Sequence, residues 1–397
     1  MDNLTLIHLV SEQTLQNLLP TLALRPSHVI QVRSSDPRFD RTPSYLETAC
    51  REAGLTETKF LTPETIPGAS PDITETSAFL TTLCERQKGH SLCLNFTGGT
   101  KLMSIGSYRV AEHLRIPSLY TDTLHRRNFV DGGTGPFLKI LPELHSFLNQ
   151  ITVPVVMAAQ GKEFRKDSIT PQLLEFGKAA WSIRSQHHEA VAAWTSRIRT
   201  AVPRDKNGRV ESKSGKLKDF LLSPLPFPEA DAAQDYLDAA VQAGLLSVDA
   251  SGEVHMQTEP KRSAVERVSN LLDGAWLELA VAAAANDGSR YGDIHWSVQP
   301  SDQTGEDYGE TDLIAVDRRR LNLAVVSCKT STAHVSSLEH LSSWRDRTRT
   351  LGGSHASGIL CLFRVKSPDE EGRLRAMGKK MGIEILIGDE IVTHFSE

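Results

Sequence analysis

The sequence lacks the cysteine pattern of a disulfide framework or a structural zinc site. Its five cysteines are scattered along the 397 residues, and no two of them form a Cys-x-x-Cys pair. They are Cys50, Cys84, Cys93, Cys328 and Cys361. An odd number of scattered thiols is typical of a protein in a reducing compartment, so we do not expect disulfides to hold this fold together.

Long apolar runs are also missing. No segment approaches the roughly 20 apolar residues that a membrane-spanning helix requires. The N-terminus offers only the short apolar run Leu4–Val10, without the basic region that opens a signal peptide. These two absences predict a cytoplasmic protein with no membrane partner.

A strong excess of one charge is likewise absent, because the formal net charge is only -5. This balance neither favours nor excludes nucleic acid, since binding depends on where the basic groups cluster. The chain is 39% hydrophobic and 23% charged, as expected of a globular protein. Its 397 residues exceed one ordinary core, so we expect two or three domains.

Residues 1–150 alternate short apolar runs with amphipathic ones. The predicted strands are Leu4–Val10, His28–Val32, Ser91–Asn95 and Pro117–Tyr120. The predicted helices are Ser11–Leu24, Arg41–Ala53, Ser77–Gln87 and Leu102–Leu114. Apolar strands that alternate with helices favour a parallel sheet covered on both faces. We therefore expect a doubly wound, Rossmann-like domain with a ligand site beyond the carboxyl ends of its strands.

Residues 151–265 have a different character. Pro171–Trp194 predicts one helix or two, and Asp231–Ala243 predicts another, followed by a polar hairpin through Gly252. Helices before a small hairpin favour an α+β, winged-helix-like module. The basic stretch Arg199–Lys218 is either a solvated linker or a nucleic-acid contact.

Residues 266–397 read as a third, α/β domain. A long amphipathic helix is predicted over Val265–Ala285. It is followed by a strand meander at Asp293–Val298, Asp312–Asp317 and Leu321–Cys328. The helix Ser337–Thr350, the strand Gly358–Phe363 and the helix Glu370–Met381 complete the pattern.

The segment Asn95–Lys101, Asn-Phe-Thr-Gly-Gly-Thr-Lys, follows an apolar strand and opens a helix. Two glycines allow close approach to the backbone, and the helix N-terminus with its threonines and lysine favours an anion. The segment matches neither the GxGxxG fingerprint nor a Walker A loop. It is a phosphate cradle or, alternatively, a glycine turn with a capping threonine.

Two further segments would face the same crevice, because Val10–Gln13 ends the first predicted strand and Arg33–Ser35 the second. Together with the TGGTK loop they resemble the CARF domains, Rossmann-like sensors of cyclic oligoadenylates made by type III CRISPR complexes. The resemblance covers about residues 1–150. It implies a ligand site lined by Ser11, Gln13, Thr97, Gly98, Gly99, Thr100 and Lys101. Tyr120 and Asp122 are additional candidates, although a packed tyrosine and a turn aspartate explain them equally well.

The C-terminal third carries a second chemical signal. Glu278 interrupts an otherwise apolar helix, Asp312 opens an apolar strand, and Lys329 ends the next strand. A buried charge is costly unless it is paired or bound to a metal. Helix-Glu, strand-Asp and strand-xxK is the arrangement of PD-(D/E)xK nucleases, restriction-endonuclease-like α/β domains. Such a site uses hard oxygen ligands to hold Mg²⁺ or Mn²⁺.

One position departs from that motif. The second acid should stand at residue 327, where this chain has Ser327. The backbone carbonyl of Cys328 can still bind a metal beside Asp312 and Glu278. Glu310, two residues before Asp312 and thus on the same strand face, could replace the missing carboxylate. The alternative is a crippled or inactive nuclease.

A CARF domain followed by such a nuclease resembles the cyclic-oligoadenylate-activated CRISPR nucleases. That resemblance implies a homodimer that binds cyclic tetra-adenylate as its allosteric activator. It also implies cleavage of single-stranded RNA, single-stranded DNA or supercoiled DNA with Mn²⁺ or Mg²⁺. Two rivals stay open: a nucleotide-responsive DNA-binding regulator with a degenerate nuclease domain, and a sensor that hydrolyses its own ligand. The TGGTK segment contains no histidine or acid to support the last of these.

Overall fold

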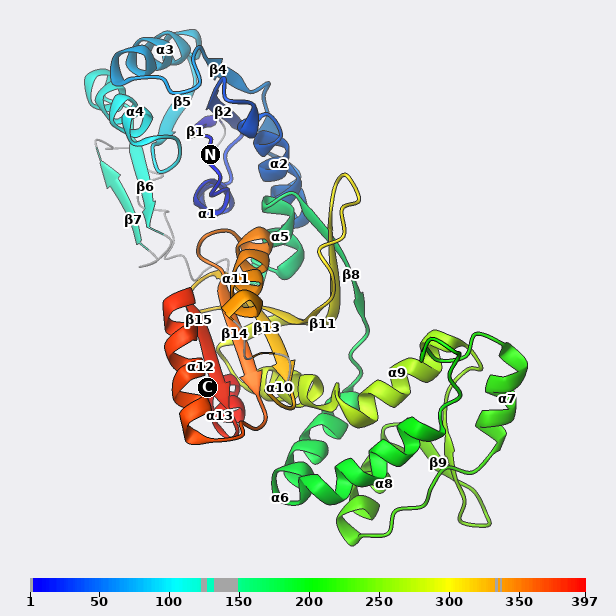
Figure 1. The fold of residues 1–397 in the computed structure, drawn as a ribbon. Coiled ribbons are helices and arrows are strands. Elements are labelled where there is room, and N and C mark those ends of the chain that lie inside the picture. The colour runs from blue at the N-terminus through cyan, green and yellow to red at the C-terminus, as the bar shows by residue number, and fades with distance from the viewer. Residues whose placement is uncertain (1–2, 123–126, 132–148, 333–334, 336–337) are drawn as a thin grey trace.

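The fold was analysed in a computed structural model that describes residues 3–122, 127–131, 149–332, 335 and 338–397. An N-terminal domain lies at one end, a second sheet lies below it, and a mostly helical module projects to the side (Figure 1). The helical module is built from the middle of the chain (Figure 1).

The N-terminal domain is the predicted doubly wound fold. Its sheet has the order β3-β2-β1-β5-β6-β7, with β4 paired to β2, and only β7 runs antiparallel to its neighbour. Its strands are β1 (Leu4–Leu9), β2 (His28–Ser34), β3 (Lys59–Phe60), β4 (Glu64–Ile66), β5 (Ser91–Asn95), β6 (Ser118–Asp122) and β7 (Arg127–Asp131). Its helices are α1 (Leu15–Leu24), η1 (Pro37–Phe39), α2 (Thr42–Glu52), α3 (Ile73–Arg86) and α4 (Lys101–Leu114). Strand order reverses between β1 and β5, which is where such sheets bind ligands.

The second sheet is mixed, with the order β15-β14-β13-β12-β11-β8. Strands β8, β11, β12 and β13 form antiparallel pairs, whereas β13, β14 and β15 run parallel. Its strands are β8 (Lys162–Asp167), β11 (Tyr291–Asp302), β12 (Thr311–Asp317), β13 (Asn322–Lys329), β14 (Ser357–Leu362) and β15 (Ile383–Ile387). The helices are α10 (Trp276–Asp287), α11 (Leu338–Gly352), α12 (Pro368–Met381) and α13 (Glu390–Ser396). The sequence prediction did not include β8, β15 or α13.

Helix α5 (Val153–Ala159) connects the two sheets. It packs between α2 and the C-terminal sheet (Figure 1). One apolar cluster contains Leu18 and Leu46 of the N-terminal domain, Val156 of α5, and Val325 and Leu341 of the C-terminal domain. The two domains therefore share a core. The division at residues 150 and 265 stays a proposal, in which β8 of the middle stretch contributes the edge strand of the C-terminal sheet.

The middle module contains the predicted helices and hairpin. Its elements are α6 (Pro171–Ala201), α7 (Ser214–Leu222), α8 (Asp231–Gln242), β9 (Leu246–Val248), β10 (Val254–Met256) and α9 (Arg262–Asp273). Helix α6 is kinked at His187, whose φ of -130° and ψ of 36° are not helical. Strands β9 and β10 pair antiparallel, as the polar turn through Gly252 predicts.

The single long helix predicted over Val265–Ala285 is wrong. The chain forms two helices there, α9 and α10, bent by 72°. Gly274 follows α9 with a non-helical φ of -128°, and glycine costs about 1 kcal/mol in a helix interior. Buried Arg184 and Tyr236 donate to the Leu272 carbonyl at 2.7 and 2.9 Å, which satisfies an acceptor that the break leaves free.

Among the described residues, no single helix is both long and apolar enough to cross a membrane. The bent pair of α9 and α10 reaches the length and composition of a span only when its two helices are counted together.

Candidate active site and ligand pocket

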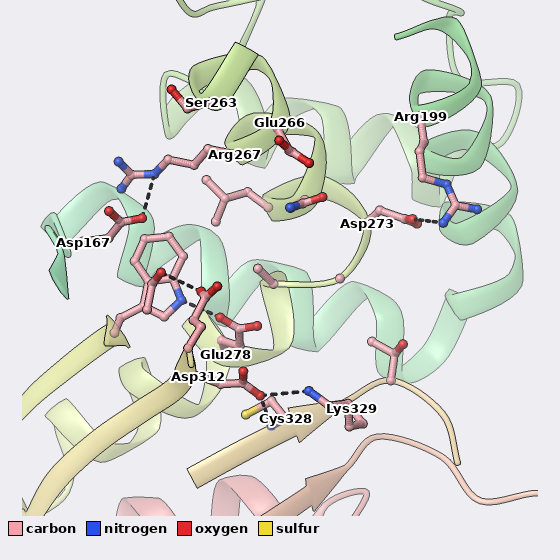
Figure 2. A pocket seen from close by; sticks show the side chains of 18 residues that line it. Asp167, Arg199, Ser263, Glu266, Arg267, Asp273, Glu278, Asp312, Cys328 and Lys329 are labelled. Carbon is pink, nitrogen blue, oxygen red and sulfur yellow. Dashed lines mark hydrogen bonds and ion pairs between the residues drawn. The ribbon is translucent and has the colours of Figure 1, made fainter. Parts of the chain in front are cut away.

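A pocket of about 570 Å³ lies where α9 and α10 meet the ends of β12 and β13 (Figure 2). The carboxylates of Glu278, Glu310 and Asp312 line it, together with Cys328 and Lys329. Ser327 is buried beside it and donates to Asp312 at 3.2 Å. The structure thus brings together all the residues that the sequence assigned to the nuclease site.

The pairing of β12 with β13 explains this convergence. Leu313 lies opposite Val326, so Asp312 near the start of one strand faces the last residues of the other. Asp312 Oδ2 accepts hydrogen bonds from the Cys328 backbone N–H at 2.6 Å and from Lys329 Nζ at 3.1 Å (Figure 2). Two apolar strands joined by a tight turn therefore place the acid and the lysine side by side, at the ends of the strands that lie away from the turn.

Lys329 is held as an ammonium. Burial by itself would lower its pKa, but the adjacent Asp312 carboxylate attracts the charge and accepts its hydrogen bond, and the pKa is raised overall. A charged lysine can donate to an oxygen anion or to a water, but it cannot take up a proton.

Glu278 lies in the first turn of α10 and accepts a hydrogen bond from Trp296 Nε1 at 2.6 Å. Burial and the nearby charge of Asp312 raise the pKa of Glu278 to about 8, against the opposing effect of the Trp296 hydrogen bond. Two carboxylates in a partly apolar pocket repel each other, and a bound cation removes that cost.

These donors fit a hard divalent ion. Carboxylate and carbonyl oxygens are the ligands that Mg²⁺ and Mn²⁺ prefer. Burial and the neighbouring Cys361 raise the pKa of the Cys328 thiol well above its usual range, so its sulfur is a protonated thiol when no metal is bound. The backbone carbonyl of Cys328 is the oxygen donor that this residue offers, and its role as a metal ligand stays a prediction.

Several pocket residues were missed by the sequence analysis. Trp296 and Ser297 come from β11, and Arg267 and Asn270 come from α9. Arg267 lies over the Trp296 ring, with 5.2 Å between its Cζ and the ring centroid. Of the basic stretch Arg199–Lys218, Arg199 alone lines this pocket, and it pairs with Asp273 at 3.0 Å. No periodicity marks these positions, because residues of α6, α9 and β11 meet only in the folded chain.

A second pocket, of about 250 Å³, lies beyond β1 and β2 of the N-terminal domain. It is lined by Val10, Ser11, Glu12, Gln13, Ser34, Phe39, Gly99, Thr100 and Met103. Four of the predicted ligand residues, Ser11, Gln13, Gly99 and Thr100, are in this set. Phe39, the last residue of η1, was not predicted.

The glycine pair brings the TGGTK loop close to β1. A Cβ at Gly98 would lie 2.1 Å from the Leu9 carbonyl oxygen, and Gly99 has a left-handed φ of +73°. Thr100 caps α4 by accepting from the Met103 N–H at 3.2 Å. The loop is therefore both a glycine turn with a capping threonine and a helix N-terminus that opens on a pocket.

The remaining predicted ligand residues do not line this pocket. Thr97 Oγ1 donates to Asn95 Oδ1 at 2.6 Å and accepts from the Thr121 N–H at 2.7 Å, so it ties β5 to β6. Lys101 is exposed and has no ion pair with any residue that the structure describes. Tyr120 packs against Phe96 with ring centroids 5.8 Å apart. Asp122, at the end of β6, is half-buried.

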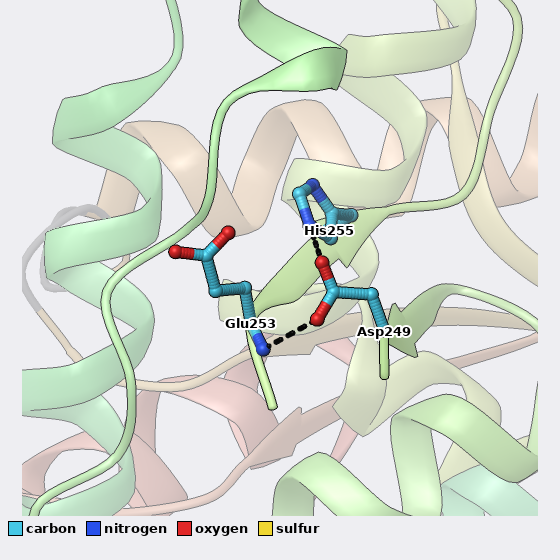
Figure 3. A group of neighbouring side chains, drawn as sticks. All are labelled: Asp249, Glu253 and His255. Carbon is cyan, nitrogen blue, oxygen red and sulfur yellow. Dashed lines mark hydrogen bonds and ion pairs between the residues drawn. The ribbon is translucent and has the colours of Figure 1, made fainter. Parts of the chain in front are cut away.

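Asp249, Glu253 and His255 form a third group of polar side chains, on the β9–β10 hairpin (Figure 3). Their ligand atoms lie within 4.8 Å of one another. Asp249 accepts from the N–H groups of Ser251 and Glu253 and so closes the hairpin turn. We interpret these side chains as residues that stabilise an exposed hairpin turn, and not as a metal site.

The geometry defines a doubly wound domain with a pocket beyond its strands, joined to a mixed sheet with a Glu-Asp-Lys pocket. Residues 5–133 match the family model of the Card1 CARF domain. No curated protein matches the sequence. The match supports the CARF resemblance of the N-terminal domain, and the solved structures that follow share the fold.

Three solved structures share the fold. Protein VC1899 from Vibrio cholerae is 17% identical with a TM-score of 0.69, over 99% of this chain and 97% of that one. Can2 from Sulfobacillus thermosulfidooxidans, solved with cyclic tetra-adenylate, is 16% identical with a TM-score of 0.65 over 99% and 97%. A type III CRISPR defence DNA nuclease activated by cyclic oligoadenylate is 18% identical with a TM-score of 0.52, and the match covers 92% of this chain and 46% of that one.

Proposed function

We propose that this protein is a metal-dependent endonuclease of type III CRISPR defence that cyclic tetra-adenylate switches on. The convergence of Glu278, Asp312 and Lys329 in one pocket carries this proposal. The match of residues 5–133 to the Card1 CARF domain supports the activator side. The substrates that fit are single-stranded RNA, single-stranded DNA and supercoiled DNA.

The pocket residues divide the work of phosphodiester hydrolysis. Asp312 and Glu278 would hold Mn²⁺ or Mg²⁺, with the Cys328 carbonyl and Glu310 as further oxygen donors. The bound ion would activate water and offset charge on the phosphate. Lys329 donates to Asp312 at 3.1 Å and, from this position, would orient the attacking water. Ser327 supplies a neutral hydroxyl where the motif has an acid.

The N-terminal pocket suits a cyclic nucleotide. The N-terminus of α4 and Lys101 provide positive potential for phosphates. Ser11, Gln13 and Thr100 offer polar groups at the pocket wall, and Phe39 offers an aromatic face for a base. A ring of four adenylates has its own two-fold symmetry, which two such pockets related by a two-fold axis would match.

The contact between the domains supports activation through the sensor. Gln13 lines the N-terminal pocket, and its Oε1 lies 3.2 Å from where a Cβ on Gly353 would stand, just after α11. The shared core around α5 makes a second connection. A ligand that favours one arrangement of the sensor therefore also biases the nuclease domain.

The experiment that tests the proposed function is nicking of supercoiled plasmid with Mn²⁺, with and without cyclic tetra-adenylate. We expect EDTA to stop cutting and the activator to raise the rate about 5- to 150-fold, the usual range of allosteric coupling. Equal rates with and without activator would contradict the switch. If the protein binds the activator but cuts nothing under any metal, the rival interpretation, a DNA-binding regulator with a degenerate nuclease domain, is correct.

The homodimer is a separate prediction. Three large apolar side chains are exposed on α4 and β6, namely Leu102, Ile105 and Tyr120, at 42%, 44% and 40%. We expect two copies to pair through α4, because a second chain would remove Leu102 and Ile105 from water. Ile105→Glu should then give a monomer by light scattering at concentrations where the wild type is a dimer.

Leu222→Glu provides the matched control for the dimer prediction. Leu222 is 80% exposed on the middle module, so the same change there should leave the dimer intact. A wild-type protein that stays monomeric with and without cyclic tetra-adenylate would contradict the prediction.

A further inference from the structure

Strand β11 breaks the normal alternation of side chains beside the nuclease pocket. Ser297 has a left-handed φ of +48°, and the pairing with β8 shifts register between Trp296 and Gln299. On a regular strand, residues two apart share a face. Here Trp296 packs in the cluster with α10, whereas Val298 packs in the cluster with α5. The bulge lets both Trp296 and Ser297 line the same pocket.

Each of these two side chains holds a different carboxylate. Trp296 Nε1 donates to Glu278 Oε2 at 2.6 Å, and Ser297 Oγ donates to Glu310 Oε1 at 2.7 Å. Glu278 comes from α10 and Glu310 from the residue before β12. Two adjacent residues of one strand therefore aim two acids from different elements at the pocket of Asp312.

The bulged segment is anchored on both sides. Trp296 is 3% exposed, and Arg267 covers its ring while pairing with Asp167 at 3.6 Å. Upstream on β11, Asp293 has a φ of +46° and accepts from the Val153 N–H at 2.6 Å and from His295 Nε2 at 2.9 Å. A left-handed backbone is disfavoured for a residue other than glycine and persists only where its surroundings impose it.

We propose that Trp296 and Ser297 are positioning residues that aim Glu278 and Glu310 at the divalent ion beside Asp312. Glu310 thereby supplies the carboxylate that Ser327 does not. The inference rests on the proposed function, because it concerns the metal of that same pocket. Groups that hold metal ligands in place typically contribute 10- to 100-fold to metal affinity or activity.

The test measures Mn²⁺ binding to the full-length protein by calorimetry, without substrate. Trp296→Phe keeps an aromatic ring and removes the N–H donor. Ser297→Gly keeps the left-handed backbone and removes the hydroxyl. We expect each variant to bind Mn²⁺ about 10- to 100-fold more weakly than the wild type. In plasmid nicking the half-saturating Mn²⁺ concentration should rise by the same factor, while the rate at saturating Mn²⁺ stays within a few-fold of wild type.

A matched control and a rescue separate positioning from general damage. Trp194 is also buried, and its Nε1 donates to the Pro226 carbonyl at 2.7 Å in the middle module. Trp194→Phe makes the same chemical change outside the pocket and should leave Mn²⁺ binding unchanged. Ser297→Asn restores a donor on a residue that tolerates the left-handed region, and it should recover most of the affinity that Ser297→Gly loses.

The possible results test the positioning role of Trp296 and Ser297 separately from the nuclease activity. If the wild type binds Mn²⁺ and cuts, while Trp296→Phe and Ser297→Gly both match it, the positioning role is wrong and the nuclease stands. If Ser297→Asn stays as weak as Ser297→Gly, the hydroxyl's donor role is wrong. If the wild type neither binds Mn²⁺ nor cuts, the proposed function fails and this inference fails with it.

Discussion

Replacement of Asp312 by alanine should reduce cutting by about 1,000-fold or more and leave activator binding unchanged. A bound metal contributes several kcal/mol to stabilising the transition state, and each 1.36 kcal/mol is a factor of about ten in rate. Asp312 is also the acceptor that holds Lys329 and the Cys328 N–H in place. The measurement is plasmid nicking at saturating Mn²⁺ and cyclic tetra-adenylate, with calorimetry for the activator.

Two companion variants keep this result interpretable. Asp312→Asn retains an oxygen for the Cys328 N–H and removes the charge, so it should be nearly as inactive as the alanine variant while melting closer to wild type. Glu253→Ala removes an acid from the exposed hairpin group and should cut like wild type. Full activity in Asp312→Ala would show that residues 266–363 are not a PD-(D/E)xK core. Loss of activity in Glu253→Ala would show that the β9–β10 hairpin contributes to cutting.

The sequence could predict which polar residues meet in the C-terminal pocket, because each of them is a charged residue in or beside an apolar element. Glu278, Asp312 and Lys329 each interrupt or end an apolar element, and a charge in such a place needs a partner. Their order along the chain also matches the order of a known arrangement. The fold of the N-terminal domain was predictable for a similar reason, since consecutive apolar residues such as Leu92, Cys93 and Leu94 of β5 are typical of a sheet that is covered on both faces.

The sequence could not predict what depends on tertiary geometry. Arg184 and Tyr236 satisfy the Leu272 carbonyl from other helices, and this permits the bend that local periodicity conceals. Strand β8 carries alternating, mostly polar residues, because it lies at the edge of a sheet whose other strands are far along the chain. Trp296 resembles any core tryptophan until Glu278 is placed beside its N–H.

Thr97 shows how far the sequence motif predicts the contacts at the N-terminal pocket. Its place in the TGGTK loop predicts a ligand contact, but its hydroxyl is occupied by Asn95 and the Thr121 N–H. Asn95 in turn donates to Asn17 and pairs with His8, so this polar network lies between β1, β5 and α1. The Thr97 hydroxyl therefore stabilises the conformation of the loop. A direct contact with the ligand stays our proposal for the other residues of the TGGTK loop.

The last prediction concerns Lys101, which should carry activator affinity and no chemistry. Lys101 is the first residue of α4, where the helix dipole already favours an anion. A hydrogen bond to a charged group contributes about 1.5–3 kcal/mol, and a two-fold ring ligand meets two copies of the residue. Lys101→Glu should therefore weaken cyclic tetra-adenylate binding by at least about 100-fold.

Unfolding would not account for such a loss, because an acidic residue in the first turn stabilises a helix. The measurement is calorimetry with cyclic tetra-adenylate, and the control is Lys88→Glu. Lys88 precedes β5 whereas Lys101 follows it, so the two lysines lie at opposite ends of that strand and the control should bind normally. Mn²⁺ binding at the Asp312 pocket should stay unchanged in both variants. If Lys101→Glu keeps wild-type affinity, the activator binds elsewhere on the domain, and the N-terminus of α4 has no part in binding it.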